Sequence, residues 1–139
     1  MKKGFTLIEL LVTISIIAIL TGFSLVAFNG TKASARDGKR KADLLSIHSA
    51  LEIYRADFGG YPLATNYPTV LQPNYITAPT DTSPRLYSYK PGTCGTSYCG
   101  TYVLCAGLEL VTTPADTVCT TAGASCGTNI TCTYHISNP

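Results

Sequence analysis

The chain has 139 residues, of which 45% are hydrophobic and 13% are charged, with ten Lys and Arg against eight Asp and Glu. This length suits one domain with a modest core. The charged share is about half that of an average soluble protein, which argues against disorder and against a highly charged binding surface. If a short leader containing Lys2 and Lys3 is removed, basic and acidic residues balance, so nucleic acid is not expected as a direct ligand.

The cysteines and the N-terminal segment both predict export. All six cysteines lie between Cys94 and Cys132, which indicates oxidation outside the cytoplasm, because cytosolic thiols are kept reduced. The stretch Phe5–Phe28 is almost purely apolar and long enough to cross a bilayer as a helix, but too long for the apolar core of a cleaved secretory signal. Lys2 and Lys3 precede it and favour a cytoplasmic N-terminus. We expect a single-pass span in the cytoplasmic membrane, with the rest of the chain outside.

Glu9 interrupts this apolar stretch. A lone carboxylate near the centre of a bilayer costs about 2.5 to 3.5 kcal/mol, so Glu9 needs a compensating arrangement. Two interpretations stay open. Either Glu9 lies close enough to the cytoplasmic interface for its carboxylate to snorkel to water, or it is a functional carboxylate with a partner.

The segment Lys3–Val12 reads KGFTLIELLV and resembles the class III signal of type IV pilins and pseudopilins. The resemblance implies cleavage after Gly4 by prepilin peptidase, methylation of the new amine on Phe5, and retention of the apolar segment. It also implies that Glu9 pairs with the N-terminal amine of a neighbouring subunit in a filament core. Such a buried ion pair is a poor source of stability, but it sets register because a misdocked subunit leaves both charges unpaired.

A second helical segment follows the apolar one. Apolar residues recur at steps of three and four and form one stripe, which we expect to pack on the chain's own sheet: Leu44, Ile47, Leu51, Tyr54 and Phe58. No proline occurs before Pro62, so one helix can run from about Phe5 to Phe58. Gly59 and Gly60 end it, one of them in the left-handed conformation. The segment Lys41–Pro62 also resembles the corresponding stretch of major pseudopilins.

The charged residues between Lys32 and Asp43 predict a solvated helix face. Asp37 can pair there with Lys41 at i,i+4. Acidic residues interrupt the basic ones and no aromatic residue lies among them, which argues against a nucleic-acid surface.

Five prolines between residues 62 and 85 predict an irregular loop on the surface. Its part Pro79–Pro84 resembles the calcium-binding loop of major pseudopilins. Asp81 is the only carboxylate there, whereas Ca²⁺ takes six to eight oxygen ligands, so no metal site is predicted.

Three segments have strand composition: Leu86–Lys90, Thr101–Val111 and Asn129–Ile136. They suffice for a small antiparallel sheet. Tyr102 and Leu104 share one face with Ala106 by the two-residue period, and we expect that face on the helix stripe. The predicted fold class is therefore α+β, with a long N-terminal helix packed on a small antiparallel sheet, as in pilins.

The six cysteines are predicted to be disulfide-bonded: Cys94, Cys99, Cys105, Cys119, Cys126 and Cys132. Only the spacing of the first pair falls in the range usual for zinc ligands, which argues against a metal site. Six cysteines allow fifteen pairings. Because short loops close most cheaply, we favour Cys94–Cys99 and Cys119–Cys126, which leaves Cys105–Cys132. The region from Pro91 onward has few large apolar residues, so cross-links substitute for core.

No catalytic site is predicted. His48 and His135 have no adjacent Ser or Cys nucleophile with an obvious acidic partner, and the chain has no phosphate-binding loop or nucleotide fingerprint. We therefore expect neither enzymatic activity nor a cofactor.

These observations predict a structural subunit of a type IV pilus, acting in adhesion, motility or DNA uptake. Its partners are copies of itself, other pilins, the prepilin peptidase, the pilus assembly machinery and, before assembly, membrane lipid. It is extracellular after assembly. The alternatives are a pseudopilin of a type II secretion or competence system, and an anchored adhesin that never polymerises. The expected segments are a leader (1–4), a transmembrane and filament-core helix (5–30), an amphipathic helix (31–60), an irregular loop (61–85) and a disulfide-rich sheet region (86–139).

Overall fold

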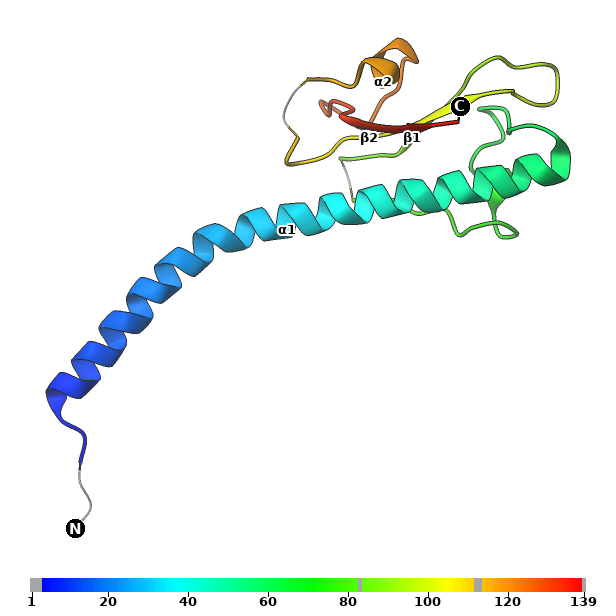
Figure 1. Ribbon diagram of the computed structural model, residues 1–139. Helices are drawn as coiled ribbons and strands as arrows, with labels where there is room; N and C mark the ends of the chain where they lie inside the picture. The colour runs from blue at the N-terminus through cyan, green and yellow to red at the C-terminus, as the bar shows by residue number, and fades with distance from the viewer. Residues whose placement is uncertain (1–3, 83, 112–113, 139) are drawn as a thin grey trace. The chain divides into compact units, whose positions relative to one another are not determined.

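The computed structural model describes residues 4–82, 84–111 and 114–138, without the side chains of residues 23–27 and 29. Its elements, in chain order, are α1 (Leu7–Phe58), the 3₁₀ helix η1 (Thr69–Leu71), β1 (Ser88–Pro91), β2 (Tyr102–Ala106), α2 (Thr117–Thr121) and β3 (Tyr134–Ser137) (Figure 1). The chain divides into two compact units at residues 35 and 36, so α1 contributes to both. An N-terminal helix followed by a three-stranded antiparallel sheet confirms the predicted α+β class.

The first unit contains the N-terminal half of α1. Its apolar side chains are exposed, for example Leu7 at 82% and Ile19 at 61%. Among the residues whose side chains are described, no helix has both the length and the apolar character needed to cross a membrane. The predicted cytoplasmic lysines, Lys2 and Lys3, lie outside the described residues.

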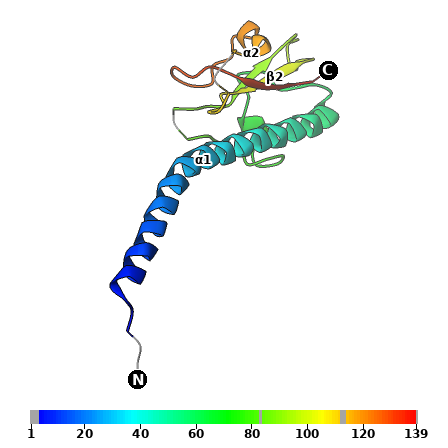
Figure 2. The ribbon, with the colours of Figure 1, turned by 60° about the vertical axis from the view of Figure 1, so that its left-hand side comes forward.

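The second unit has three layers. The sheet lies between residues 36–58 of α1 on one face and the short helix α2 on the other (Figures 1 and 2). Its strand order is β1-β2-β3, and both pairs are antiparallel. The central strand β2 is shorter than predicted because the backbone beyond Ala106 bonds to side chains: the Gly107 carbonyl accepts from Arg85, and the Glu109 and Leu110 N–H groups donate to Asp37. β3 starts later than predicted because a turn precedes it, with Asn129 at φ 58°.

The core confirms the predicted pairing of helix stripe and sheet face. Tyr102, Leu104 and Ala106 of β2 are buried in one cluster with four stripe residues of α1: Leu44, Ile47, Leu51 and Tyr54. Phe58 was wrongly included in the stripe, since it is 47% exposed and stacks on the exposed Tyr98 at 6.2 Å between ring centroids. The helix ends there, and Gly59 has the predicted left-handed conformation, with φ 79°.

The segment of residues 61–85 lies only partly on the surface, contrary to the prediction. Tyr61 and Leu71 are fully buried. The Tyr61 ring meets Tyr102 edge to face at 4.5 Å, and its hydroxyl donates to Glu52 of α1 at 2.8 Å. Tyrosine explains the difference, because its ring fills core space while its hydroxyl still reaches a polar partner.

All six cysteines are in disulfides, but only one pair matches the prediction. Cys94–Cys99 is confirmed. The predicted pairs Cys119–Cys126 and Cys105–Cys132 are wrong, because the structure joins Cys105 to Cys119 and Cys126 to Cys132.

The actual pairing follows from local structure. α2 packs on β2, which brings Cys119 to Cys105 with their Cα atoms 6.0 Å apart. Left-handed residues Gly127 and Asn129 reverse the chain and return Cys132 to Cys126, at 5.4 Å. Loop length did not separate the two candidate partners of Cys126, because Cys132 is 6 positions away and Cys119 is 7, and even a doubling of loop length changes the closure free energy by only about 0.6 kcal/mol.

Exposure predicts the order in which the disulfides are reduced. Cys94 is exposed, whereas the cysteines of the other two bonds are at most 7% exposed, in one buried cluster. In folded, full-length protein, a mild thiol reductant should free Cys94 and Cys99 first, and the buried bonds should persist until the protein unfolds. Alkylation followed by peptide mass spectrometry measures this order. Equal release of all six thiols, or labelling before reduction, would contradict it.

Candidate functional site

The helix start around Glu9 is a capping box. Thr6 precedes α1, and its carbonyl accepts the Leu10 backbone N–H at 3.3 Å. The Thr6 backbone N–H and hydroxyl donate to Glu9 Oε2 at 2.8 and 2.7 Å, and the Glu9 N–H reaches the Thr6 hydroxyl oxygen at 3.4 Å. This reciprocal pattern satisfies backbone donors that the first helical turn leaves unpaired.

The capping box gives Glu9 a role within its own chain that the sequence analysis missed. The signal was present, because Thr-x-x-Glu ahead of an apolar run is the typical sequence of such a helix start. Both contacts from Thr6 to the Glu9 carboxylate go to one oxygen, Oε2. The pairing of Glu9 with a neighbouring Phe5 amine stays a prediction.

The predicted cleavage bond lies in a segment without regular secondary structure. Gly4 and Phe5 precede the helix, and Phe5 is 90% exposed. Phe5 and Glu9, one helical turn apart, line the same shallow hollow of about 370 Å³ together with Ile8, Val12 and Thr13. The structure thus places Phe5 and Glu9 together on one exposed face, and Gly4 directly precedes Phe5.

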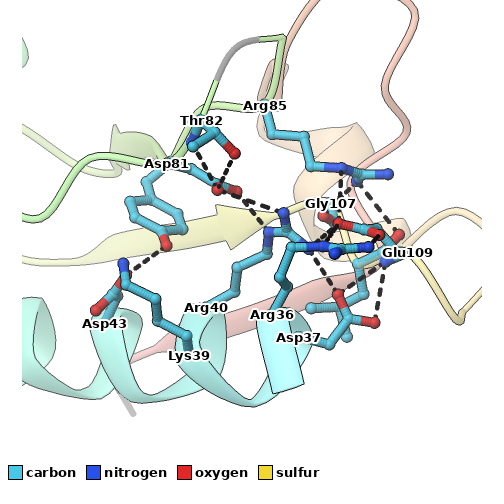
Figure 3. Close-up of polar contacts among 12 residues, drawn as sticks. Arg36, Asp37, Lys39, Arg40, Asp43, Asp81, Thr82, Arg85, Gly107 and Glu109 are labelled. Atoms are coloured by element: carbon cyan, nitrogen blue, oxygen red, sulfur yellow. Dashed lines mark hydrogen bonds and ion pairs between the residues drawn. The ribbon is translucent and has the colours of Figure 1, made fainter. Parts of the chain in front are cut away.

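A second group of polar residues lies in the second unit around the buried side chains of Asp37 and Arg40 (Figure 3). We call it the Arg40 cluster and define it as Arg36, Asp37, Arg40, Asp81, Arg85 and Glu109. The Arg40 side chain is 3% exposed and contacts three carboxylates. Its guanidinium donates to Asp37 and Glu109 at 2.8 Å each, and to both oxygens of Asp81.

The cluster joins three segments of the chain. Arg36, Asp37 and Arg40 belong to α1, Asp81 and Arg85 to the loop before β1, and Glu109 to the segment after β2. Asp37 also accepts the backbone N–H groups of Glu109 and Leu110 at 2.9 Å each. The helix therefore holds the segment that follows the central strand.

The electrostatics of the cluster are balanced, with three arginines against three carboxylates. Donation from Arg36 outweighs partial burial and lowers the pKa of Glu109 to about 2. Burial opposes the charge of Arg40, but hydrogen bonds to Asp81, Glu109 and Asp37 raise its pKa. Burial likewise opposes ionisation of Asp37, and the backbone donors of Leu110 and Glu109 overcome it and lower its pKa.

The prediction of a solvated charged face was wrong at its centre. Asp37 is 6% and Arg40 2% exposed, and they pair with each other at i,i+3. Lys41, the predicted partner of Asp37, lies over the Tyr134 ring at 5.4 Å. The helical period could have predicted their burial, because Asp37 and Arg40 continue the apolar stripe toward the N-terminus from Leu44 at steps of three and four residues.

Asp81, the only carboxylate of the loop that resembles a calcium site, pairs with Arg40 and accepts the Thr82 backbone N–H at 2.7 Å. Its charge is therefore balanced by a guanidinium. Within the described residues, no group of three or more His, Cys, Asp or Glu side chains is arranged to hold a metal ion.

The two histidines have polar partners that sequence reasoning did not find. His135 Nδ1 lies 2.6 Å from Asp116, which caps α2 by accepting the Val118 and Cys119 N–H groups. His48 Nδ1 lies 2.5 Å from the Tyr102 hydroxyl at the edge of the core. These contacts support the helix and the sheet.

Comparison with known proteins agrees with the geometry of the N-terminus. A family model described as the prokaryotic N-terminal methylation motif matches residues 1–25. The chain carries this methylation motif. The matched residues contain the Gly4–Phe5 junction and the capping box, so the resemblance to type IV pilins and pseudopilins is confirmed at the N-terminus.

Similarity extends beyond the methylation motif in several relatives. The type II secretion system core protein G of Vibrio cholerae is 33% identical over 86 residues, which cover 62% of this chain and 56% of that protein. Its Escherichia coli counterpart is 34% identical over 61 residues, 44% of this chain and 42% of that protein. The type IV major fimbrial protein FimA of Dichelobacter nodosus is 42% identical over 52 residues, 36% of this chain and 32% of that protein. The matches therefore span about half or less of these relatives, and no solved structure matches.

Loss of the Arg40 guanidinium should strongly destabilise the second unit. Arg40→Ala leaves three carboxylates without their shared partner, and breaking a buried pair in this way costs about 3 to 5 kcal/mol. The matched control is Lys39→Ala, because Lys39 is 64% exposed and makes one i,i+4 pair, worth about 0.3 to 0.5 kcal/mol. Urea unfolding of the oxidised, detergent-solubilised full chain measures both. Equal losses would show that the cluster does not stabilise the fold.

The lowered pKa of Glu109 predicts acid sensitivity. A carboxyl group whose pKa is lower in the folded than in the unfolded state stabilises the fold at pH values above its unfolded pKa. This stabilisation is lost as the pH falls through the folded pKa. The free energy of unfolding should thus decline as pH drops from about 4.5 toward about 2. Glu109→Gln should be less stable at neutral pH and should show a shallower decline in that window. Unfolding curves at a series of pH values test this, and parallel declines for both proteins would contradict it.

Proposed function

We propose that the protein is a structural subunit of a type IV pilus. The observation that carries the proposal is the methylation motif at residues 1–25, followed by a helix with an exposed apolar face and a cross-linked folded unit. An apolar helix face of this kind needs lipid or another helix to cover it, and a filament supplies the second. The role is mechanical and requires no catalytic group or cofactor.

Maturation begins at the Gly4–Phe5 bond. The prepilin peptidase cleaves after Gly4, and the new amine on Phe5 is methylated. Both residues precede the helix and are exposed, which supports this proposal because a peptidase must reach the bond that it cleaves. Before assembly the apolar helix is held in the cytoplasmic membrane with the folded unit outside, and afterwards the subunit is extracellular.

Assembly uses the face that Phe5 and Glu9 share. The Glu9 carboxylate of one subunit pairs with the Phe5 amine of a neighbour, and the capping box keeps that carboxylate at the helix start. The partners are copies of this chain, other pilins and the assembly machinery.

A pseudopilin of a type II secretion or competence system is the second candidate. It is supported by the similarity to type II secretion core proteins G. The pairing of Asp81 with Arg40 favours the pilus, because it leaves the loop that resembles a calcium site without a free carboxylate. The weakly charged, cross-linked C-terminal region also suits an exposed filament surface.

Processing is tested by the N-terminus of the mature chain. Intact-mass spectrometry of subunits from the membrane should show a chain that begins at Phe5 and carries one methyl group on its amine. A chain that retains Met1, or one that begins beyond Phe28, would remove the filament proposal.

The role of the Glu9 charge can be separated from its capping role. Glu9→Gln keeps an acceptor for the capping box but removes the charge, so helix formation should persist and membrane insertion should become easier by up to about 2.5 to 3.5 kcal/mol. In a filament the Phe5 amine would lose its partner, at about 3 to 5 kcal/mol per contact, which should block growth.

The matched control is Thr6→Val, which removes the capping hydroxyl but keeps the carboxylate charge. It costs the helix start about 1 kcal/mol and should still allow filaments. Sheared filament and processed membrane subunit are compared at matched expression, without wild-type subunit present. Normal filaments in Glu9→Gln would refute the ion pair. Loss of filaments in Thr6→Val but not in Glu9→Gln would show that Glu9 acts only in capping the helix.

A further inference from the structure

Two exposed aromatic rings lie beside each other at the end of α1. Phe58 is 47% and Tyr98 39% exposed, and their rings stack with 27° between the planes and 6.2 Å between the centroids. Tyr54, one helical turn before Phe58, lies 4.5 Å from it between centroids. We call these three residues the aromatic platform. Single exposed apolar side chains are normal on a protein surface, whereas adjoining aromatic rings indicate an interaction site.

Local structure holds Tyr98 in this position. It lies in a hairpin that the Cys94–Cys99 disulfide closes. The last residue of that hairpin exchanges two backbone hydrogen bonds of 2.9 Å with Tyr61. Tyr98 also packs so closely on Gly60 that a Cβ there would lie 2.7 Å from the Tyr98 Cβ. The backbone that carries the exposed ring is therefore fixed before binding, which lowers the entropic cost of binding.

The Tyr54 hydroxyl has no hydrogen-bond partner among the described residues, although Tyr54 is only 7% exposed. The hydroxyls of the other buried tyrosines in that part of the chain have partners at 2.8, 2.6 and 2.5 Å: those of Tyr61, Tyr89 and Tyr102. No fully buried side-chain oxygen or nitrogen of the described residues lacks a partner, so the Tyr54 hydroxyl reaches solvent. Buried tyrosines usually pair this group, so here it is available to a ligand.

The free Tyr54 hydroxyl opens beside the exposed rings. Burial, together with the neighbouring Tyr98 phenol, raises the pKa of Tyr54, an effect that requires the two side chains to be close. The Tyr98 hydroxyl also has no hydrogen-bond partner within the described residues. The platform thus combines a flat apolar surface with two free hydroxyls at its edge. Ligand sites have this composition, with aromatic surface for contact and a few polar groups for orientation.

The charged side chains around the platform already have partners. Arg55 lies 3.8 Å from Glu52, and Asp57, which directly precedes Phe58, accepts the Tyr75 hydroxyl at 2.7 Å. A nucleic acid needs a positive surface for its phosphates, and a carboxylate beside the exposed rings opposes it. The chemistry of the platform therefore fits an uncharged ligand that has a flat apolar face and hydroxyl groups around its edge.

We propose that the aromatic platform binds a neutral polysaccharide, with a sugar ring against Phe58 and Tyr98 and its hydroxyls bonded to those of Tyr54 and Tyr98. A pyranose with equatorial hydroxyls has such a flat face, made of axial C–H groups. One shallow contact of this kind is weak, with a Kd of about 1 mM. The proposal rests on the proposed function for its strength, because identical copies along a filament multiply the contact.

The test measures binding of cellotetraose, an uncharged β-linked glucan, to the oxidised full chain in a detergent without a sugar head group. Saturation-transfer NMR should detect binding at millimolar sugar, with transfer to the axial protons. Tyr98→Ala should weaken binding about ten-fold, because it removes one ring of the stack. Tyr54→Phe should weaken binding several-fold without lowering the urea midpoint, because the hydroxyl that it removes has no partner among the described residues.

The matched control is Tyr89→Phe. The hydroxyl that it removes is buried and donates to the Pro62 carbonyl at 2.6 Å, so this variant should lower the urea midpoint and bind cellotetraose normally. Opposite patterns in Tyr54→Phe and Tyr89→Phe separate ligand binding from stability. Equal loss of binding in the two variants would show that general destabilisation is being measured, and would overturn the site.

Absence of binding by the wild-type chain, or unchanged binding by Tyr98→Ala, would overturn the polysaccharide site and leave the proposed function intact. Single-stranded DNA that binds through Tyr98 in place of the glucan would also overturn it. Sheared filaments should be retained on insoluble β-glucan more strongly than solubilised subunit. Filaments that fail to bind while the subunit binds would show that a second copy covers the platform. Binding by the subunit in cells that form no filaments would support the site and contradict the proposed function.

Discussion

The buried guanidinium of Arg40 is the interaction on which the second unit depends. It contacts carboxylates from α1, from the loop before β1 and from the segment after β2, so it is satisfied only when all three are in place. A buried charge without partners is strongly unfavourable, and a paired one adds little net stability over an apolar core. The cluster therefore acts mainly by making one arrangement of the three segments far better than its alternatives.

The central strand β2 connects this cluster to the rest of the unit. Its alternate residues face opposite sides, with Leu104 in the tyrosine-rich core on α1 and Cys105 in the disulfide cluster under α2. Large aliphatic residues are sparse in the C-terminal region, so tyrosine rings and cross-links supply the burial that a small domain needs. Glu109 and Asp116, the only charged residues after Pro91, each hold a local structure in place: the Arg40 cluster and the start of α2.

Periodicity in the sequence was sufficient to predict the long helix, its stripe and the sheet face that covers it, because burial of apolar side chains dominates those choices. It failed at Asp37 and Arg40, which occupy stripe positions but are charged, and whose partners lie far away in sequence. Spacing alone did not decide the disulfide pairing, because Cys126 is 6 positions from Cys132 and 7 from Cys119, and the packing of α2 on β2 selects the partner of Cys119. The capping role of Glu9 could be predicted from the Thr6-x-x-Glu9 spacing, whereas the membrane cost of its charge indicates only that the carboxylate needs a partner.

The N-terminal methylation motif and the exposed apolar face of α1 support the central proposal, that this chain is assembled into a polymer and does not remain a lone anchored protein. The most direct test of that proposal is electron microscopy of surface filaments from cells with and without the chain, together with the copy number of the chain in sheared filaments. The account predicts that filaments disappear when the chain is deleted, return when it is restored, and contain it as a stoichiometric subunit. Unchanged filaments in the deletion strain, with the chain found only as membrane-anchored monomer, would contradict it.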